Sequence, residues 1–222
     1  WYDIRNEFYN SGSDSIYAPQ IFGDSSAYAD VYSISPKEVA FYIQDKMEFD
    51  DMVINVGLRY DQFDPESVYP SDRRNPANQL ILPDSMMSLY PEAPVISQIS
   101  PRVGFAYQLG GQAVLHFSYG HFFQMPPMYA MYQNNSFLVD PNNFVTRMGN
   151  TLLEPEKTIT YEIGLWQELN QVMALDVALF YRDIYNLLTT KTISTYNQVK
   201  YGLYSNKDYG NVRGLELKLD LA

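Results

Sequence analysis

Alternation with a period of two residues dominates the chain, and helical periodicity is hard to find. In the segment 113–123, alternate side chains are mainly aliphatic or aromatic, and the side chains between them are mostly small or polar. Six further segments follow the same pattern, at 38–49, 52–61, 101–109, 159–165, 173–182 and 214–221. Successive side chains of a strand point to opposite faces. The pattern therefore predicts an all-β fold, an antiparallel meander of about seven strands with one apolar face.

The lengths of the strands and of their connections favour a membrane barrel over a soluble sandwich. The predicted strands have roughly 9–13 residues, which suits the about 9–11 of a bilayer-crossing strand better than the about 5–6 of a typical globular one. Short turns at Asp50–Asp51, Gly110–Gln112 and Asn170–Gln171 alternate with long connections, at 62–98, 124–156 and 184–208. This alternation predicts a partial transmembrane β-barrel with short periplasmic turns and long extracellular loops. Rings near the strand ends would form an interfacial girdle: Tyr60, Tyr107, Tyr119, Phe123 and Tyr181.

Composition and charge exclude several classes of function. The chain has 222 residues, with 15 Lys and Arg against 26 Asp and Glu, and its formal net charge is −11 at pH 7. Such a chain offers no broad cationic surface for a nucleic-acid backbone. It has no Cys and only 2 His, which excludes disulfides, thiolate chemistry and a three-His metal site. No apolar run approaches the roughly 18 residues of a spanning helix. The sequence therefore predicts no cofactor, no metal centre and no nucleic-acid partner.

Several segments resemble the barrel of TonB-dependent outer-membrane receptors. The run Leu153–Gly164 is similar to the family pattern L-x-P-E-x-[ST]-x-x-[YW]-E-[LI]-G. Further segments resemble other strands of that barrel, in the same order and spacing: Phe41–Lys46, Asn55–Asp61, Ile99–Gly104, Tyr119–Pro127, Leu175–Ile184 and Asn211–Leu217. The likeness is greatest to the branch whose full-length members carry an N-terminal carboxypeptidase-regulatory-like domain.

The resemblance implies an organisation and a function. Residues 37–222 would form part of a barrel of about 22 strands, and residues 1–36 would form an extracellular loop with the remnant of a preceding strand. The family's plug domain, TonB-contacting segment and terminal barrel strand have no counterpart in this sequence. The expected partners are outer-membrane lipid, the rest of the same barrel and its plug, with TonB reached only through an upstream segment. The expected function is part of a receptor that takes up a scarce nutrient at the bacterial cell outer membrane.

Prolines and glycines have expected places in such a barrel. Pro155 has no amide donor and is expected just outside the strand ladder, and Pro101 is expected as the first residue of its strand. Five glycines fall on the polar face, where they would either let a plug or substrate approach closely or relieve strain in a coiled sheet: Gly57, Gly104, Gly120, Gly164 and Gly214.

The candidate site residues form two groups. The first group faces the lumen, where it would either brace the wall through cross-strand ion pairs or touch a plug or substrate: Arg59, Arg102, His116, Glu162, Asp176, Arg182, Glu216 and Lys218. The second group lies in two long loops, where it would either pack loop against loop or line an extracellular ligand mouth: Met86, Met87, Tyr90, Met125, Met128, Tyr129, Met131 and Tyr132.

Two other functions remain open from the sequence. One is a structural or adhesive outer-membrane barrel, and the other is a secreted soluble β-sandwich that binds carbohydrate through loop aromatics. An enzyme is not expected, because Pro155 at a loop boundary explains the spacing of Glu154 and Glu156 better than a catalytic cleft does. No nucleophile or nucleotide-binding motif is present. The substrate stays open among iron chelates, oligosaccharides, peptides and cobalamin.

Overall fold

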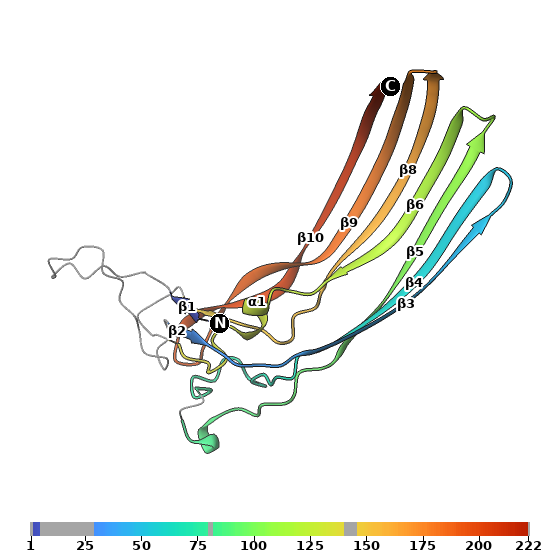
Figure 1. Ribbon diagram of the computed structural model, residues 1–222. Helices are drawn as coiled ribbons and strands as arrows, with labels where there is room; N and C mark the ends of the chain where they lie inside the picture. The colour runs from blue at the N-terminus through green and yellow to red at the C-terminus, as the bar shows by residue number, and fades with distance from the viewer. Residues whose placement is uncertain (1, 5–28, 80–81, 140–145, 222) are drawn as a thin grey trace, which may run out of the picture.

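One antiparallel sheet dominates the computed structural model, which describes residues 2–4, 29–79, 82–139 and 146–221 (Figure 1). Its strands pair in the order β3-β4-β5-β6-β8-β9-β10, and the short β7 pairs with β10 in parallel. A separate pair is formed by β1 and β2. The bounds are β1 Tyr2–Ile4, β2 Ala29–Val31, β3 Lys37–Glu48, β4 Met52–Asp64, η1 Asp84–Met86, β5 Ile96–Leu109, β6 Ala113–Gln124, α1 Met128–Tyr132, β7 Arg147–Met148, β8 Glu156–Asn170, β9 Met173–Ser194 and β10 Lys200–Leu221.

The antiparallel meander predicted from the alternation is confirmed. Each of the seven long strands overlaps an expected segment, and β9 and β10 extend far beyond theirs, with 22 residues each. Figure 1 shows them as one curved, open sheet, with hairpin turns at one end and long connections at the other. We refer to these as the turn end and the loop end. In the described part of the chain, no helix has the length and apolar character that crossing a membrane requires.

The expectation for residues 1–36 can be followed only in part. Residues 2–4 and 29–31 form the antiparallel pair β1 and β2, with Tyr2 opposite Val31 and Ile4 opposite Ala29. Residues 1 and 5–28 lie outside the described residues. The extracellular loop expected there therefore stays a prediction.

The short turns lie close to where the sequence places them. Gly110 and Gly111 connect β5 and β6 with φ values of 60° and 81°, in the left-handed region that glycine adopts without strain. The third turn is shifted by one residue, because Asn170 is still the last residue of β8. Its side-chain Oδ1 accepts the Val172 amide at 3.0 Å, which closes the turn.

The long connection expected at 184–208 is wrong, because the strands continue through most of it. β9 ends at Ser194 and β10 begins at Lys200, so only residues 195–199 connect them. The Asn, Asp and Gly residues that suggested a loop lie at irregularities of the ladder. Asn186 has a φ of 62°, and register shifts occur between Asn206 and Asp208 and between Asp208 and Gly210. A bulge interrupts pairing locally and lets it resume. At the loop end, β9 and β10 therefore remain paired with each other beyond the first residue of β8.

The two prolines behave differently. Pro155 immediately precedes β8, as expected. Pro101, expected to begin its strand, instead lies inside β5, opposite Leu58 of β4. Pairing of β5 with β6 starts one residue later, with Arg102 opposite Gly120. The missing amide of Pro101 therefore costs no hydrogen bond on the β6 side.

The register collects the apolar side chains on one face of the sheet. Phe105, Phe117, Ile163, Leu179 and Leu215 are successive cross-strand partners from β5 to β10. Among the described residues no second sheet covers this apolar face, and many of its side chains are exposed: Phe41, Ile43, Leu58, Ile99, Ile163, Leu179, Leu215, Leu217, Leu219 and Leu221.

Tyrosine rings follow the apolar face toward the loop end. The rings of Tyr119 and Tyr161 lie 5.1 Å apart, and those of Tyr161 and Tyr181 lie 6.4 Å apart. Nearer the loop end, Tyr185 and Tyr209 form a further ring pair at 5.2 Å. Two of the five residues expected in an interfacial girdle, Tyr119 and Tyr181, belong to this row, and the girdle itself stays a prediction.

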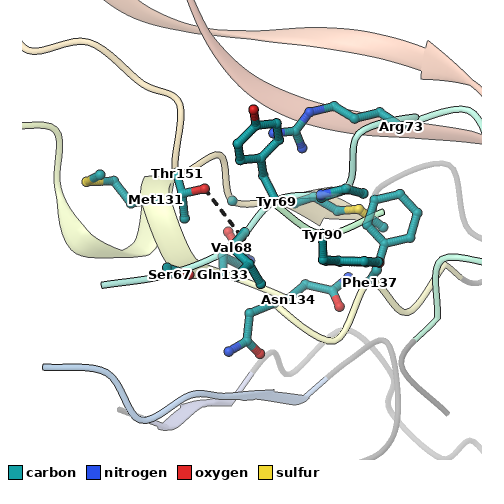
Figure 2. Close-up of a pocket in the computed structure, with 14 residues that line it drawn as sticks. Ser67, Val68, Tyr69, Arg73, Tyr90, Met131, Gln133, Asn134, Phe137 and Thr151 are labelled. Atoms are coloured by element: carbon teal, nitrogen blue, oxygen red, sulfur yellow. Dashed lines mark hydrogen bonds between the residues drawn. The ribbon is translucent and has the colours of Figure 1, made fainter. Parts of the chain in front are cut away.

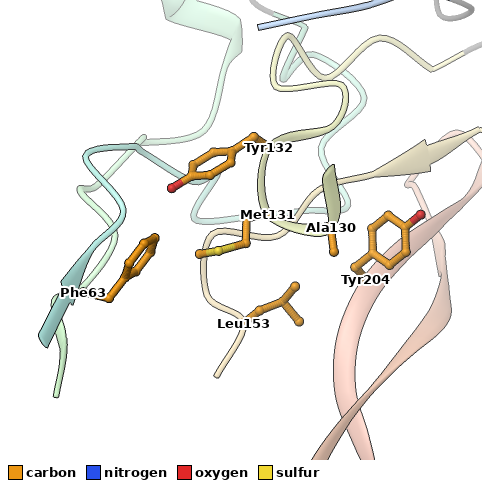
Figure 3. Packing of buried hydrophobic residues seen from close by; sticks show 6 residues of the cluster. All are labelled: Phe63, Ala130, Met131, Tyr132, Leu153 and Tyr204. Carbon is orange, nitrogen blue, oxygen red and sulfur yellow. The ribbon is translucent and has the colours of Figure 1, made fainter. Parts of the chain in front are cut away.

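The loop end contains the buried core of the chain. Figure 3 shows α1 presenting Ala130, Met131 and Tyr132 toward Phe63, Leu153 and Tyr204, which come from the end of β4, the entry to β8 and from β10. A second cluster beside it contains Phe137, Met148, Tyr201 and Leu203. Parts of the long connections, among the described residues, are therefore packed into a core.

Candidate functional sites on the polar face and at the loop end

The polar face lies opposite the apolar one and contains all eight residues of the first candidate group. One row of successive cross-strand partners crosses five strands, from β4 to β9: Gly57, Arg102, Gly120, Thr160 and Arg182. Four residues nearer the turn end along β6, another row places His116 opposite Gly164 and Ala178 opposite Glu216. Strand alternation and register are therefore sufficient to place these side chains on a common surface.

Arg102 lies in a groove of about 340 Å³ on this face. Its guanidinium carbon lies 4.9 Å from the centroid of the Phe122 ring. We refer to this feature as the Arg102 groove. It is lined by Gln44, Asn55, Val56, Gly57, Arg102, Val103, Gly104, Ser118, Tyr119, Gly120, Phe122 and Thr160. The arrangement offers one cation, several amide and hydroxyl groups and an aromatic ring to a polar molecule.

The five glycines of the polar face divide into two kinds. Gly57, Gly104 and Gly120 line the Arg102 groove, and a Cβ built on Gly104 would come no nearer than 3.7 Å to its neighbours. At Gly164 a Cβ would lie 2.1 Å from His116 Nε2, and at Gly214 it would lie 2.5 Å from the Phe180 ring. Gly57 and Gly104 leave the wall open, whereas Gly120 lies against the Phe122 ring, which a Cβ built there would approach to 3.2 Å. Gly164 and Gly214 give room to a cross-strand ring.

The other arginines of the first group are held by neighbours on their own strands. Arg59 Nη2 lies 2.7 Å from Asp61 Oδ1, and Asp61 is buried. The guanidinium carbon of Arg182 lies 4.9 Å from the centroid of the Phe180 ring. These contacts run along β4 and β9, rather than between strands.

The acidic and lysine residues of the first group lie on the same face. Lys218 is the cross-strand partner of Asp176, but its Nζ pairs with Asp220 Oδ1 of its own strand at 2.9 Å. Asp176 Oδ1 is buried without a hydrogen-bond partner among the described residues. Glu162 lies opposite Ser118 on β6 and Phe180 on β9. A role in contacting a plug or substrate stays a prediction for all of them.

The second candidate group is divided by burial. Met131 and Tyr132 are almost fully buried in the loop-end core, and Met125 packs against it. Tyr132 donates a hydrogen bond from its hydroxyl to the Pro65 carbonyl at 3.0 Å, and burial raises its pKa to about 12. Loop packing therefore accounts for these three residues.

Other members of the second group remain accessible. Met86, Met128 and Tyr129 are exposed, and the Tyr129 ring makes an edge contact with Tyr204 at 5.8 Å. Met87 is half-buried beside η1. Tyr90 is half-buried, and its hydroxyl donates to the Asn78 carbonyl at 2.5 Å. An extracellular ligand mouth, if formed by this group, would use the exposed side chains.

Two sets of residues that the structure brings into these sites were not selected from the sequence. Gln44, Asn55, Ser118 and Thr160 line the Arg102 groove, and their alternation already placed them on the polar face. The second set forms loop contacts that no spacing indicates. An example is Asn150, which accepts a hydrogen bond from Arg73 at 2.7 Å and donates to the Tyr204 carbonyl at 2.9 Å.

The structure offers no alternative centre built on metal ligands within its described residues, since no group of three or more His, Asp and Glu side chains gathers there. Glu154, one of the two closely spaced carboxylates, accepts a hydrogen bond from Asn186 Nδ2 at 3.0 Å. Its backbone is held by Asn206, which accepts from the Glu154 amide at 2.7 Å and donates to its carbonyl at 2.8 Å. These contacts give Glu154 a structural place at the boundary of β8.

Comparison with solved structures finds the same fold in two receptors and a transporter. The siderophore receptor PirA from Pseudomonas aeruginosa matches with a TM-score of 0.57 and 17% identity, over 83% of this chain and 31% of that one. A double mutant of the Serratia marcescens hemophore receptor HasR, in complex with its hemophore HasA and heme, matches with a TM-score of 0.57 and 16% identity. This match covers 88% of this chain and 32% of that one. The FrpB iron transporter from Neisseria meningitidis matches with a TM-score of 0.54 and 15% identity, over 86% of this chain and 24% of that one.

These likenesses show the fold, and the chain spans about a third or less of the length of each of these receptors. A search of curated proteins finds no match. The family model described as TonB dependent receptor-like, beta-barrel matches residues 1–222. The chain therefore belongs to the TonB-dependent receptor β-barrel family.

Proposed function

We propose that the chain forms part of the wall of a transporter in the bacterial outer membrane, and that the whole protein takes up a scarce nutrient. The turn end would face the periplasm and the loop end would lie outside the cell. The chain itself would have no catalytic role. It would supply a stretch of barrel wall, one side of the passage and part of the external loop layer.

The observation that carries this proposal is a single sheet with two unlike faces. The apolar face remains exposed, with Leu217 at 67% and Leu221 at 72% of their full accessibility. A soluble sandwich would bury such a face under a second sheet, whereas a barrel strand presents it to lipid. The opposite face contains charged and amide groups together with the Arg102 groove, which suits a water-filled or plugged interior.

The wall would work only with the rest of its barrel. Edge strands carry unpaired amide and carbonyl groups, and the hydrocarbon core of a bilayer does not tolerate an open sheet edge. β3 lies at one edge of the sheet, and within the described residues β10 pairs on its outer side only with β7, through Gly202 and Leu203. Further strands, a plug and contact with TonB are therefore assigned to the parent protein.

The cargo proposed for the first tests is a metal complex. The similar structures are described as receptors or transporters for siderophore, heme and iron, and another is described as a copper transporter. The Arg102 groove adds a cation and an aromatic ring on the inner wall. Both observations support a polar, anionic complex more than a neutral sugar.

The test is uptake by the source bacterium with and without the parent gene. Cells are starved of iron or copper and then given labelled ferric chelates, heme or Cu²⁺, in the presence or absence of an uncoupler. We expect deletion to abolish uptake of one cargo, and the uncoupler to abolish it in wild-type cells. Equal uptake by both strains for every cargo, including labelled oligosaccharide and cobalamin, would instead identify a structural or adhesive barrel.

A further inference from the structure

A half-buried arginine lies in the connection between β4 and β5, and no carboxylate of the described residues pairs with it. The Nη2 atom of Arg73 donates a hydrogen bond to Asn150 Oδ1 at 2.7 Å. Asn150 is itself fixed by its hydrogen bond to the Tyr204 carbonyl at 2.9 Å. A guanidinium has five N–H donors in a planar fork. Within the described part of the chain this contact is the one side-chain hydrogen bond of Arg73, so it anchors the group and leaves most of its donors available.

The charge of Arg73 is not balanced nearby. The ion pairs among the described residues do not include it. The adjacent carboxylate of Asp72 is turned to the backbone, where Oδ1 accepts the Arg74 amide at 2.9 Å. Burial lowers the pKa of Arg73, and burial raises the pKa of the neighbouring Tyr90 to about 12. Arg73 therefore stays cationic at neutral pH beside a neutral phenol.

Arg73 borders a small pocket at the loop end, and Figure 2 shows its side chain extending toward the Tyr69 ring. The pocket has a volume of about 130 Å³. Tyr69, Tyr90, Phe137 and Met148 contribute apolar surface, and Asn135 contributes an amide group. The Asn134 amide also borders the pocket, but both of its ends bond to the backbone of Leu138. A cation at the edge of an aromatic pocket is complementary to a small molecule with an apolar body and one negative end.

We propose that this pocket binds the carboxylate of a small organic anion, with Arg73 as its cationic partner. A carboxylate brings one negative charge to one unpaired positive charge, and its two oxygens match the guanidinium fork. A phosphate would bring up to two charges into a half-buried site that offers one. The proposal goes beyond transport, because the pocket is built from the loop connections and its occupancy does not depend on what crosses the membrane.

Benzoate and benzamide form a matched pair of probes, because they share a ring and differ in charge. Binding is measured by titration calorimetry on the full-length receptor in detergent micelles. We expect benzoate to bind and benzamide to bind at least about tenfold more weakly, a difference of about 1.4 kcal/mol. Arg73→Gln should remove this preference. Arg74→Gln is the control, because Arg74 is exposed and stacks on Tyr196 at 4.8 Å.

If Arg73→Gln does not fold, a labelling experiment on the wild-type receptor tests whether the pocket binds a carboxylate. Phenylglyoxal modification is followed by mass spectrometry, with benzoate, inorganic phosphate or benzamide present. We expect benzoate to slow the modification of Arg73 and to leave that of Arg74 unchanged. Equal modification with benzoate and benzamide would overturn the site. Stronger protection by phosphate than by benzoate would overturn its assignment to a carboxylate. Neither measurement uses uptake, so the result is independent of the transport proposal.

Discussion

At the scale of single residues, glycine has two uses on the polar face that the sequence does not separate. Gly164 lies against the His116 ring, and Gly104 borders open space in the Arg102 groove. Both follow the same alternation, and both are flanked by ordinary strand residues. What differs is the cross-strand partner, which is His116 for Gly164 and Ser118 for Gly104. The first glycine therefore serves folding, and the second leaves room in the wall.

Gly164→Ala tests the folding role. The added Cβ would lie 2.1 Å from His116 Nε2, so the ring must leave its position. We expect the free energy of unfolding of the full receptor in liposomes to fall by about 1–3 kcal/mol. Urea titration measures the change, and Gly104→Ala is the control with no close neighbour. Adding His116→Ala to Gly164→Ala should restore most of the loss. A double variant no more stable than the single one would contradict this account.

Gly104→Trp tests the open wall. The backbone has room for a Cβ at this position, so the indole can project into the Arg102 groove and obstruct it. We expect normal amounts of receptor in the outer membrane and uptake of its cargo well below the wild-type rate. Leu165→Trp on the apolar face is the matched control, because an indole there meets lipid. Equal uptake by the two variants would show that the groove does not lie on the route of the cargo.

Placement on a face could be predicted from the sequence, but side-chain partners could not. Alternation places Arg59 and Arg102 on the polar face, since period 2 is a local property of the chain. Whether Arg59 meets Asp61 or a ligand depends on rotamers and neighbours. Met131 and Tyr129 illustrate the same limit, because one is buried and the other exposed within a single short helix.

At the scale of elements, the β9–β10 hairpin shows how turn residues mislead. Asn186, Asn206 and Gly210 are residues typical of loops, yet the ladder continues past all three. The surrounding residues are β-branched or aromatic, such as Thr192 and Tyr201, and favour strand. Local composition does not distinguish a bulge from a loop end, because both need the same backbone conformations. The cross-strand partner decides between them.

Asn206→Ala tests the hydrogen bonds that join this hairpin to the residues before β8, which we call the clasp. Asn206 holds the amide and the carbonyl of Glu154, and its Nδ2 also donates to the Asn186 carbonyl at 2.7 Å. The substitution leaves these backbone groups without partners, at a cost of about 1–3 kcal/mol. We expect faster trypsin cleavage after Arg147 in the intact receptor. Asn211 is exposed on the same strand, so the Asn211→Ala receptor should be cleaved at the wild-type rate. Equal cleavage rates for the two variants would contradict the clasp.

At the scale of the whole molecule, stability is distributed unevenly between the two ends. The loop end holds the buried clusters around Met131 and Tyr201. The rest of the sheet is a single layer whose apolar face is exposed, as at Ile43 and Leu217. Hydrophobic burial stabilises the first part within the chain itself, and only lipid can supply an equivalent for the second. The single-layer part of the sheet therefore depends on its surroundings for stability.

Residues 1–222 expressed alone should therefore fail to form a stable monomer in water. We expect aggregation without detergent, and a β-sheet circular dichroism spectrum only in micelles or together with the remaining strands of the barrel. The open edges at β3 and β10 add to the exposed apolar face, because both offer unpaired backbone groups to other chains. The control is the full-length receptor refolded under the same conditions. A folded, detergent-free monomer of residues 1–222 would contradict the membrane wall and favour a soluble domain, because water would then tolerate the face that includes Leu215, Leu217 and Leu219.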